Sequence, residues 1–265
     1  MHQQAGRSIN GFRLREPKVT FRIIRRCNFD CPGCSTFSSL DRRGKVRIDD
    51  FRRAIDLLHT CNFRGVLNIS GGEPTFHEDL PAMLKYASRK LKNGRIALFT
   101  NGDWIGNPGW RKKLEDLFAD ANILIRFSLD RQHAQGALRA AGVTPTHARI
   151  NAVEKQRKQK GRLFTDAMQS LAAVPGVNFD FAFKGSATQA REYMRGMGKV
   201  PIYFIRFRKN PEKRPKDFGF LAIDVQKDDT LLVYPTLGHI PSGEPLGGLE
   251  SLPHALDMNR EALKQ

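Results

Sequence analysis

Three closely spaced cysteines constrain this chain more than any other feature of its sequence. Cys27, Cys31 and Cys34 stand at C-x3-C-x2-C spacing, directly after the alternating apolar run 19–24. The run predicts a β-strand, so the cysteines occupy the loop that leaves its end. Thiolates on one short loop suit a soft metal centre, either zinc or an iron–sulfur cluster. A structural zinc site takes four protein ligands, whereas a [4Fe–4S] cluster with only these cysteines keeps one iron open for another ligand.

The rest of the chain alternates strand and helix patterns, which predicts repeated βα units and a parallel sheet. The cysteine loop then lies at the carboxyl end of its strand, where such sheets bind ligands. The predicted fold class is therefore α/β. The predicted strands cover residues 18–26, 65–70, 95–100, 123–130, 177–183 and 202–207. The predicted helices cover 48–58 with Asp49 as N-cap, 80–91, 110–118, 147–173 with a break near Gly161, and 187–197.

The pattern changes after about residue 210. Two apolar runs, 219–225 and 230–234, flank Lys227-Asp228-Asp229 and predict a β-hairpin. A Gly/Pro-rich segment then leads to a last predicted helix, over 253–263. We therefore divide the chain into an N-terminal arm (1–17), a core domain (18–210) and a small extension of hairpin and helix (211–265).

Two further motifs, Gly71-Gly72-Glu73-Pro74 and Thr100-Asn101-Gly102, follow the second and third predicted strands. Together with the cysteine loop, and in this order, they resemble the radical S-adenosylmethionine (radical SAM) superfamily across roughly residues 18–210. The resemblance implies a partial (β/α)6 TIM-like barrel in which the three cysteines hold a [4Fe–4S] cluster. The open iron would bind the amino and carboxylate groups of S-adenosyl-L-methionine. One electron would then cleave it to a 5′-deoxyadenosyl radical, which abstracts hydrogen from a substrate.

The resemblance assigns the cofactor site to the loops after these strands. It implies that Gly71, Gly72 and Glu73 bind the methionine amino group, since glycines admit a close approach and a carboxylate pairs with an ammonium. Thr100 and Asn101 would line the same pocket through an Asx-type turn. The alternative for each motif is an ordinary turn.

Polar residues at the end of the fourth strand extend the predicted site. Ser128 and Asp130 alternate on one face of this strand, and the resemblance implies contacts with the ribose hydroxyls and the methionine carboxylate. The alternative is a polar strand end that caps the next helix. His133 is a catalytic candidate for binding substrate or moving a proton, against a structural or surface histidine. Lys184 and Arg206, near the ends of the last two strands, are candidates to face a carboxylate or phosphate, and exposed charges are the favoured alternative for each.

Cys61, the last of the four cysteines, lies at the end of the first predicted helix. A free cysteine is commonly a small core residue. The alternative is a catalytic thiol that donates a hydrogen atom to a substrate radical, as in family epimerases, which requires Cys61 to reach the pocket. Many relatives carry cysteines for auxiliary clusters in a C-terminal extension, and this extension has none. Gly33 departs from the aromatic residue that usually precedes the third cysteine in the family.

The chain is strongly basic, with 44 Lys+Arg against 27 Asp+Glu and a formal net charge of +17. Such a field favours acidic partners: nucleic acid, nucleotides, acidic peptides, or a reductase such as flavodoxin or ferredoxin. The basic residues are spread along the chain, with denser patches at 155–162 and 206–216. A solvated basic surface is therefore the alternative to nucleic-acid binding.

Composition bears on the compartment in which the protein acts. Apolar residues make up 40% of the chain, enough for a core. No run of about 18 apolar residues predicts a membrane-spanning helix. Residues 1–7 lack the apolar region of a secretory signal, and the clustered cysteines do not form a disulfide framework. We expect a cytoplasmic protein, because a reducing environment protects an iron–sulfur cluster.

The sequence as a whole predicts a radical SAM enzyme with iron–sulfur, oxidoreductase-like chemistry. The favoured substrate is a peptide or small metabolite in a biosynthetic pathway, such as a ribosomally made peptide that is crosslinked or epimerised. A second hypothesis is an enzyme that modifies RNA or a nucleotide, which the charge of +17 favours. A third, from another class, is a non-catalytic metal-binding or nucleic-acid-binding module that uses the cysteines structurally.

Overall fold

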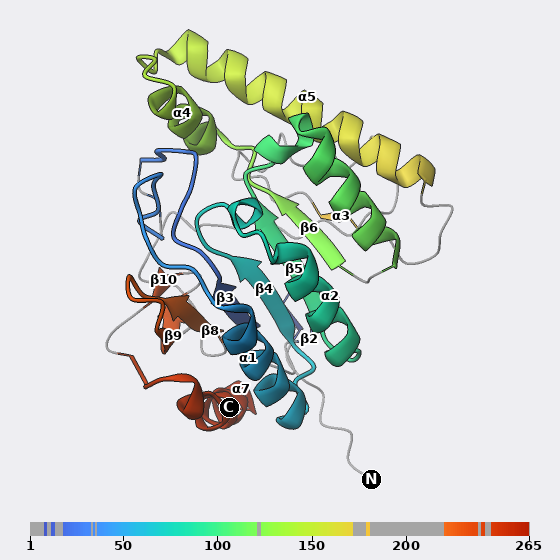
Figure 1. The fold of residues 1–265 in the computed structure, drawn as a ribbon, viewed down its shortest axis with the longest axis vertical. Helices are drawn as coiled ribbons and strands as arrows, with labels where there is room; N and C mark the ends of the chain where they lie inside the picture. The colour runs from blue at the N-terminus through green and yellow to red at the C-terminus, as the bar shows by residue number, and fades with distance from the viewer. Residues whose placement is uncertain are drawn as a thin grey trace.

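The computed structural model describes residues 8–9, 12–13, 18–32, 34, 36–120, 123–171, 179–180, 220–237, 240–241 and 245–264. Within these residues the main sheet runs in the order β10-β9-β8-β3-β4-β5-β6-β7 (Figure 1). Its strands are β3 (Lys18–Arg22), β4 (Val66–Ser70), β5 (Arg95–Thr100), β6 (Ile123–Phe127), β7 (Phe179–Asp180), β8 (Phe220–Val225), β9 (Leu231–Leu237) and β10 (Ile240–Pro241). A separate pair joins β1 (Ser8–Ile9) to β2 (Phe12–Arg13).

The main sheet is mostly parallel and does not close. Strands β8, β3, β4, β5, β6 and β7 are parallel neighbours, whereas β9 and β10 are added antiparallel at one edge. This arrangement confirms the α/β class and is consistent with a partial TIM-like barrel. The predicted hairpin forms as β8 and β9, and β8 continues the parallel sheet beside β3, with Thr20 opposite Ala222. The hairpin is therefore part of the same sheet as the preceding strands.

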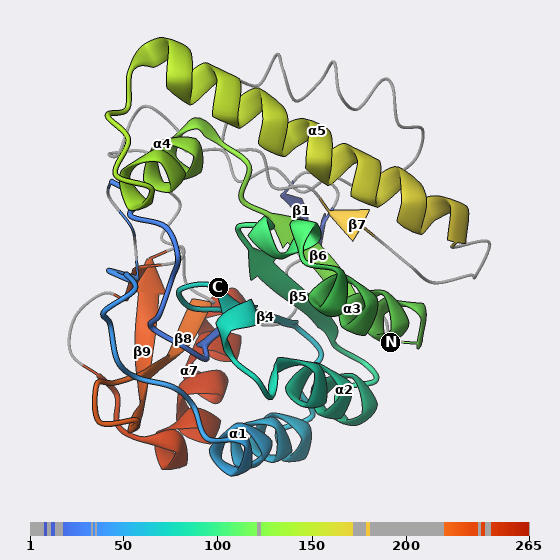
Figure 2. The ribbon, with the colours of Figure 1, turned by 45° about the horizontal axis from the view of Figure 1, so that its top comes forward.

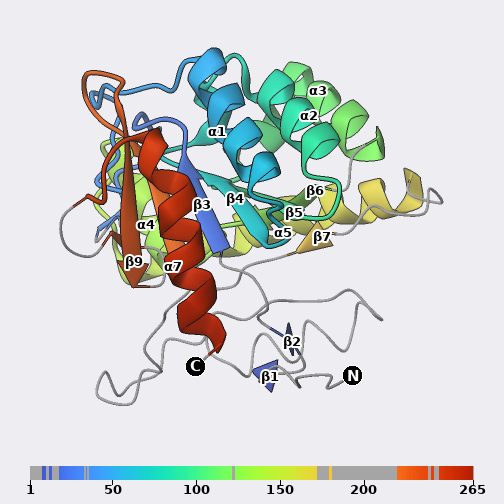
Figure 3. The same ribbon diagram turned by 90° about the horizontal axis from the view of Figure 1, so that it is seen from below.

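Three helices lie together on one face of the sheet, as Figure 3 shows. They confirm the helices predicted over 48–58, 80–91 and 110–118, with shifted ends. A further helix, α7, packs against α1 and β8 and confirms the predicted C-terminal helix. The bounds are α1 (Ile48–Thr60), α2 (Leu80–Lys90), α3 (Pro108–Asp120) and α7 (Leu252–Lys264).

The start of α1 differs from the prediction. Its N-cap is Arg47 rather than Asp49, because the helix already begins at Ile48. Asp49 and Asp50 therefore fall in the first turn, where negative charge favours the positive end of the helix dipole. The acidic pair marks the helix start through this charge effect instead of through a side-chain cap.

Two helices, α4 (Arg131–Ala140) and α5 (His147–Leu171), pack against each other beyond the carboxyl ends of the strands (Figures 1 and 2). Helix α4 is not among the predicted elements, and α5 runs through Gly161 without the predicted break. Phe164 of α5 meets Trp104 and Phe127 edge to face, with ring centroids 5.1 and 5.9 Å apart. This aromatic contact anchors α5 to the end of β6.

The face of the sheet that carries α1, α2 and α3 forms the apolar core. Side chains alternate along each strand, so every second residue points to the helices. Phe21 of β3 stacks on Phe51 of α1 with ring centroids 5.2 Å apart. Buried residues of the other strands join this cluster, among them Leu67, Ile69, Ile96, Leu98, Ile125, Leu221 and Ile223.

The opposite, inner face of the sheet carries polar side chains at its centre. Thr20 accepts a hydrogen bond from Asn68 at 3.2 Å, and Arg22 forms an ion pair with Asp224 at 3.3 Å. All of these side chains lie on strands whose other face is apolar core. A closed barrel fills its interior with branched apolar residues, so this polar face is suited to a ligand.

Several predictions fall outside the described residues: the strand over 202–207, the helix over 187–197, Lys184 and Arg206. Of the strand predicted over 177–183, the structure describes β7, which pairs in parallel with β6. In the described part of the chain, no helix is both long enough and apolar enough to cross a membrane.

Candidate functional site

The loop after β3 carries the three predicted metal-ligating cysteines. The amide of Cys34 donates to Cys31 O at 3.2 Å, which turns the chain back on itself. Cys27 Sγ accepts from the Phe29 amide at 3.4 Å, and Cys34 Sγ lies 3.2 Å from the Thr36 hydroxyl. All three thiols are free and half-buried. Cys31 and Cys34 therefore share one turn of the loop, and none of the three thiols is committed to a disulfide.

The chemistry of these thiols fits an iron–sulfur cluster. Burial raises the pKa of Cys27 to about 11 and that of Cys31 to about 12, and a bound metal supplies the positive charge that reverses this effect. Among the described residues, no three His, Cys, Asp or Glu side chains converge on a single metal ion. The thiols of a cluster do not have to converge in this way, because each one binds a different iron.

In the metal-free protein we expect Cys27 to react slowly with iodoacetamide, because the thiolate is the nucleophile. A pKa of about 11, against the ordinary 9.0, leaves on the order of 100-fold less thiolate at pH 8. Because the pKa is raised, the rate should increase about tenfold per pH unit between pH 8 and 10. Timed alkylation with peptide mapping measures it, and a rate independent of pH would contradict the burial of this thiol.

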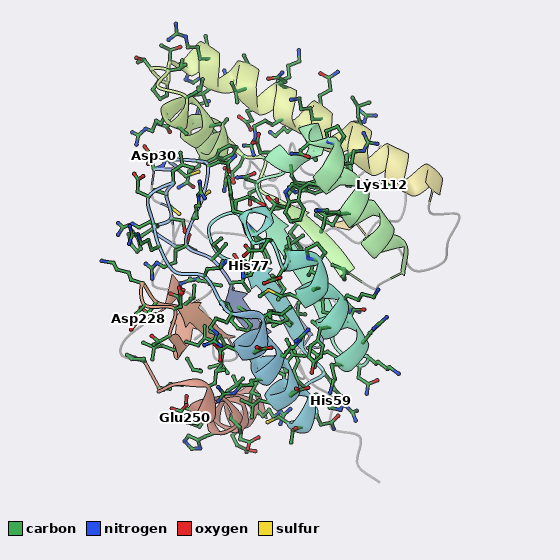
Figure 4. The ribbon with its side chains drawn as sticks, in the orientation of Figure 1. Asp30, His59, His77, Lys112, Asp228 and Glu250 are labelled. Atoms are coloured by element: carbon green, nitrogen blue, oxygen red, sulfur yellow. The ribbon has the colours of Figure 1, made fainter. Side chains whose placement is uncertain are left out.

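Helix α4 packs directly on the cysteine loop. A Cβ on Gly136 would lie 2.4 Å from Cys31 Sγ and 2.8 Å from Cys31 Cα. The amide of Asp30 donates to Gly136 O at 3.1 Å, and the Gln132 side-chain amide donates to Pro32 O. Figure 4 labels Asp30 at this contact, next to α4. The missing side chain of glycine permits the approach, so α4 holds the loop in position.

Gly71 and Gly72 bring the loop after β4 against the segment that leads to the cysteines. Gly71 has a φ of +142°, and a Cβ on it would lie 2.3 Å from Ile24 O. A Cβ on Gly72 would lie 2.0 Å from Arg26 O. The amides of Gly72 and Glu73 donate to Ile24 O at 2.7 Å and to Arg26 O at 2.9 Å. The glycines thus allow the two loops to contact each other. This role adds to the close approach of a ligand that the sequence predicts for them.

The Glu73 carboxylate lies buried between the loops after β4 and β5, with the residue 1% exposed. Oε1 accepts from the Thr75 amide at 3.2 Å, the Thr75 hydroxyl at 2.9 Å and the Thr100 hydroxyl at 2.8 Å. Oε2 accepts from the Asn101 amide at 2.7 Å. Burial raises the pKa of Glu73, and these hydrogen bonds oppose the shift. The carboxylate therefore joins two of the three predicted motifs.

Asn101 connects this network to the cysteine loop. Its Nδ2 donates to Asn28 Oδ1 at 2.8 Å, and Asn28 Nδ2 donates in turn to Asp103 Oδ2 at 2.8 Å. The Asp103 amide donates to Asn101 Oδ1 at 2.9 Å, which is the predicted Asx-type turn. Gly102, with a φ of +75°, completes the turn. All three sequence motifs therefore meet at one edge of the sheet.

Asp130 and His133 contact each other at the start of α4. Asp130 is the N-cap of the helix: its Oδ1 accepts from the His133 amide at 3.1 Å and lies 2.8 Å from His133 Nδ1. This is the capping alternative raised from the sequence. Strand β6 ends at Phe127, so Ser128 and Asp130 follow the strand instead of lying on it. The Ser128 amide donates to Thr100 O at 2.8 Å, which places Ser128 beside the motif loops.

Arg157 of α5 is a residue of the site that the sequence analysis did not single out. Its guanidinium donates to Asn101 O and to Ser128 O, the latter at 3.1 Å, and lies 4.7 Å from the Phe29 ring centroid. Nη1 is buried and has no hydrogen-bond partner among the described residues. Burial lowers the pKa of Arg157, and nearby thiol and acidic groups oppose the shift. In the sequence Arg157 stands within the basic stretch 155–162, and no feature of the sequence distinguishes it from its exposed neighbours.

Cys61 is not brought into this site. It caps the C-terminal end of α1, is partly buried against the core, and its carbonyl accepts from Arg260 of α7 at 2.8 Å. Figure 4 labels His59, two residues earlier, at the opposite end of the molecule from Asp30. This position agrees with the core alternative for Cys61.

Known proteins resemble this chain in the region that carries these motifs. The sequence profile of the Radical SAM superfamily matches residues 21–180. The chain is 31% identical over 91 residues to an S-adenosylmethionine-dependent nucleotide dehydratase of Selenomonas ruminantium, covering 34% of this chain and 32% of that protein. It is 32% identical over 145 residues to a PqqA peptide cyclase of Bradyrhizobium diazoefficiens, covering 53% of this chain and 36% of that protein. The chain thus spans about a third of the length of these relatives.

A solved structure shares the fold. Streptococcus suis SuiB bound to S-adenosylmethionine matches 89% of this chain and 64% of the SuiB chain, with a TM-score of 0.50 and 16% identity. The matched profile covers more than half of the chain and contains the cysteine loop and both motif loops. The chain therefore belongs to the Radical SAM superfamily.

Proposed function

We propose that Cys27, Cys31 and Cys34 hold a [4Fe–4S] cluster whose open iron binds S-adenosyl-L-methionine. When bound and reduced, the cluster supplies the electron that cleaves S-adenosylmethionine to methionine and a 5′-deoxyadenosyl radical, which abstracts hydrogen from the substrate. The observation that carries the proposal is the side-chain bond between Asn28 of the cysteine loop and Asn101 of the loop after β5. A non-catalytic metal-binding module does not account for the motif loops gathered around the cysteines.

The loop after β4 is proposed to bind the methionine amino group. Gly71 and Gly72 set the path of its backbone. Glu73 joins this loop to the end of β5 and the loop that follows it through two hydrogen bonds, from Thr100 and Asn101. Backbone carbonyl groups of this loop accept hydrogen bonds from an ammonium group. The Glu73 carboxylate adds negative charge near them, which favours the cationic group.

Arg157 is proposed to bind the methionine carboxylate. Two of its hydrogen bonds hold the guanidinium against Asn101 O and Ser128 O, which leaves Nη1 as a buried donor without a partner among the described residues. A buried donor without a partner is unfavourable until an acceptor reaches it, and guanidinium–carboxylate pairs are among the stronger hydrogen bonds in proteins. The Ser128 side chain remains the candidate for the ribose hydroxyls.

The substrate is proposed to bind at the polar inner face of the sheet. Asn68 is 1% exposed, and its Oδ1 has no hydrogen-bond partner in the described part of the chain. Buried acceptors normally have a donor, so a substrate hydroxyl, amide or amine would complete this site. These groups occur in small polar metabolites and in peptides, and relatives named as a PqqA peptide cyclase and a subtilosin biosynthesis protein support the peptide.

A nucleotide is the second candidate substrate. The net charge of +17 favours phosphate groups, and relatives named as a nucleotide dehydratase and a GTP 3′,8-cyclase support this choice. Binding to tRNA or a nucleotide that weakens steeply with salt would favour it over a peptide.

Turnover of S-adenosylmethionine tests the proposed function. After anaerobic reconstitution with iron and sulfide and reduction with dithionite, the wild-type protein should release 5′-deoxyadenosine, measured by chromatography. Cys31→Ala should release none. Arg157→Ala should keep its iron but require at least about tenfold more S-adenosylmethionine, since it loses one charged hydrogen bond. Lys160→Ala, an exposed change on the same helix, should match the wild type. A colourless zinc protein without turnover would remove the proposal.

A further inference from the structure

A cavity of about 350 Å³ lies away from the cysteine loop, between the C-terminal ends of α1 and α2. Residues between 59 and 63 line one side of it, and the run 89–93 lines the other. Figure 4 labels His59, one of these residues, far from Asp30 of the cysteine loop. Small-molecule sites have volumes of about 300–1,000 Å³. The cavity is therefore large enough for a small ligand, and no residue of the proposed cofactor site lines it.

The side chains that line this cavity include several cations and no acid. Arg89, Lys90 and Lys92 lie there together with His59. Basic residues are common in the last turn of a helix because of its dipole, and Lys90 forms an ion pair with Asp56 at 2.9 Å. Arg89 and Lys92 have no hydrogen bond or ion pair with any residue in the described part of the chain. Positive charges gathered without a counter-charge favour a bound anion.

Backbone hydrogen bonds fix the walls of the cavity. The Phe63 amide donates to Leu58 O at 3.0 Å where α1 ends, and the Arg95 amide donates to Gly65 O at 3.0 Å, which joins the two loops. Phe63 and Leu91, 3% and 4% exposed, contribute apolar side chains to the lining. A fixed, partly apolar wall with a few polar groups is the usual construction of a small-molecule site.

Phosphate is the anion that suits these side chains best. A guanidinium binds phosphate oxygens through two parallel hydrogen bonds, and an ammonium adds a point charge. A phosphate monoester carries about −1.5 to −2 charges at pH 7, more than a single carboxylate. Two asparagines add amide groups: Asn62 Oδ1 accepts from Arg64 Nε at 3.3 Å, which leaves the Asn62 NH2 group as a donor, and Asn93 lies on the opposite wall. The apolar side chains of the lining suit the organic part of a phosphorylated molecule.

We propose that this cavity binds the phosphate group of a small phosphorylated metabolite. The proposal goes beyond the proposed function and does not depend on it, because the site requires neither the cluster nor S-adenosylmethionine. Strands β4 and β5 begin beside the cavity and end at the loops that carry Glu73 and Asn101. A ligand that binds only the folded protein stabilises it, so phosphate should raise the melting temperature of the protein.

Calorimetric titration with inorganic phosphate and with adenosine monophosphate tests the site. The reconstituted wild type, in a chloride buffer of constant ionic strength, should bind both. The double variant Arg89→Ala, Lys92→Ala should bind both at least about tenfold more weakly, because it loses charged hydrogen bonds. Both residues are exposed, so this variant should fold and form 5′-deoxyadenosine as the wild type does. Binding of phosphate should persist in Arg157→Ala and with saturating S-adenosylmethionine.

Lys85→Ala, Lys112→Ala is the matched control, because it removes the same number of charges at exposed sites that do not line the cavity. Equal weakening in this control, unchanged affinity in the cavity variant, or a wild type that binds neither probe would overturn the proposal. Binding of tRNA that only the cavity variant loses, without binding of either probe, would also overturn it and assign the cavity to an RNA backbone. Intact phosphate binding in a protein that cannot cleave S-adenosylmethionine would remove the proposed function and leave this site standing.

Discussion

Replacing Gly136 by alanine is expected to remove most of the protein's capacity to hold an iron–sulfur cluster. Alanine in place of glycine inside a helix normally stabilises by about 1 kcal/mol. Here the new Cβ would lie 2.4 Å from Cys31 Sγ and 2.8 Å from Cys31 Cα, so either α4 or the cysteine loop must move. Overpacking of this kind costs about 1–3 kcal/mol, and the displaced thiol is a proposed cluster ligand. Iron content and visible absorbance after anaerobic reconstitution measure the effect.

Gly109→Ala is the matched control for this substitution. Gly109 lies in α3, and a Cβ there would have the Asn107 side-chain oxygen, 3.4 Å away, as its one near neighbour. This variant should bind wild-type amounts of iron. If Gly136→Ala also retains its full iron content, then α4 does not position the cysteine loop.

The second large effect is expected from Glu73→Gln in the metal-free protein. The amide presents one oxygen where the carboxylate has two, and its NH2 group faces donors. At least one of the Thr75, Thr100 and Asn101 donors then loses its acceptor. Each buried donor left unpaired costs about 1–3 kcal/mol. We therefore expect the free energy of unfolding, measured by urea titration, to fall by about 2–4 kcal/mol in the absence of S-adenosylmethionine.

Glu78→Gln tests whether this loss is specific to the buried carboxylate. The Glu78 side chain is 64% exposed and pairs with Lys45, and exposed ion pairs contribute about 0–1 kcal/mol. Unchanged stability of metal-free Glu73→Gln, together with weaker S-adenosylmethionine binding, would show instead that Glu73 acts only on the ligand. That outcome would contradict the role of Glu73 in joining the loops after β4 and β5.

The strands from β3 to β6 and helices α1 to α3 could be predicted because their periodicity is local. Strand alternation and helical spacing can be recognised within segments of 5–13 residues. The place of β8 was not predictable in the same way. Arg22 and Asp224, which pair across β3 and β8, are 202 residues apart in the sequence, and a local pattern carries no information about such a neighbour.

Helix α4 escaped prediction because its buried face is made of small residues. Ala134, Gly136 and Leu138 are its buried positions, and two of them give almost no hydrophobic signal. Position 136 requires glycine because Cys31, on the cysteine loop, occupies the space that a Cβ would need. A sequence shows which residue lacks a side chain, but not which neighbour requires the space.

The sequence predicted which residue types form the site and which loops carry them. It did not predict where their side chains point. The motifs place Glu73 and Asn101 at strand ends, yet the donors that surround the Glu73 carboxylate come from two loops brought together by the sheet. Arg157 shows the limit most clearly, because one arginine of a basic helix turns inward while Lys155 and Lys160 are exposed. That distinction depends on how α5 packs against Phe127 and Trp104.

The electron paramagnetic resonance spectrum of the reduced protein, recorded with and without S-adenosylmethionine, shows whether one iron is open to this ligand. If Cys27, Cys31 and Cys34 hold three irons of a [4Fe–4S] cluster and the fourth is open, S-adenosylmethionine should change the g-values of the reduced cluster in the wild type. Arg157→Ala should require more of it for the same change. A spectrum identical with and without S-adenosylmethionine at saturating concentration would rule out the proposed cofactor site, because no iron would then be open to the ligand.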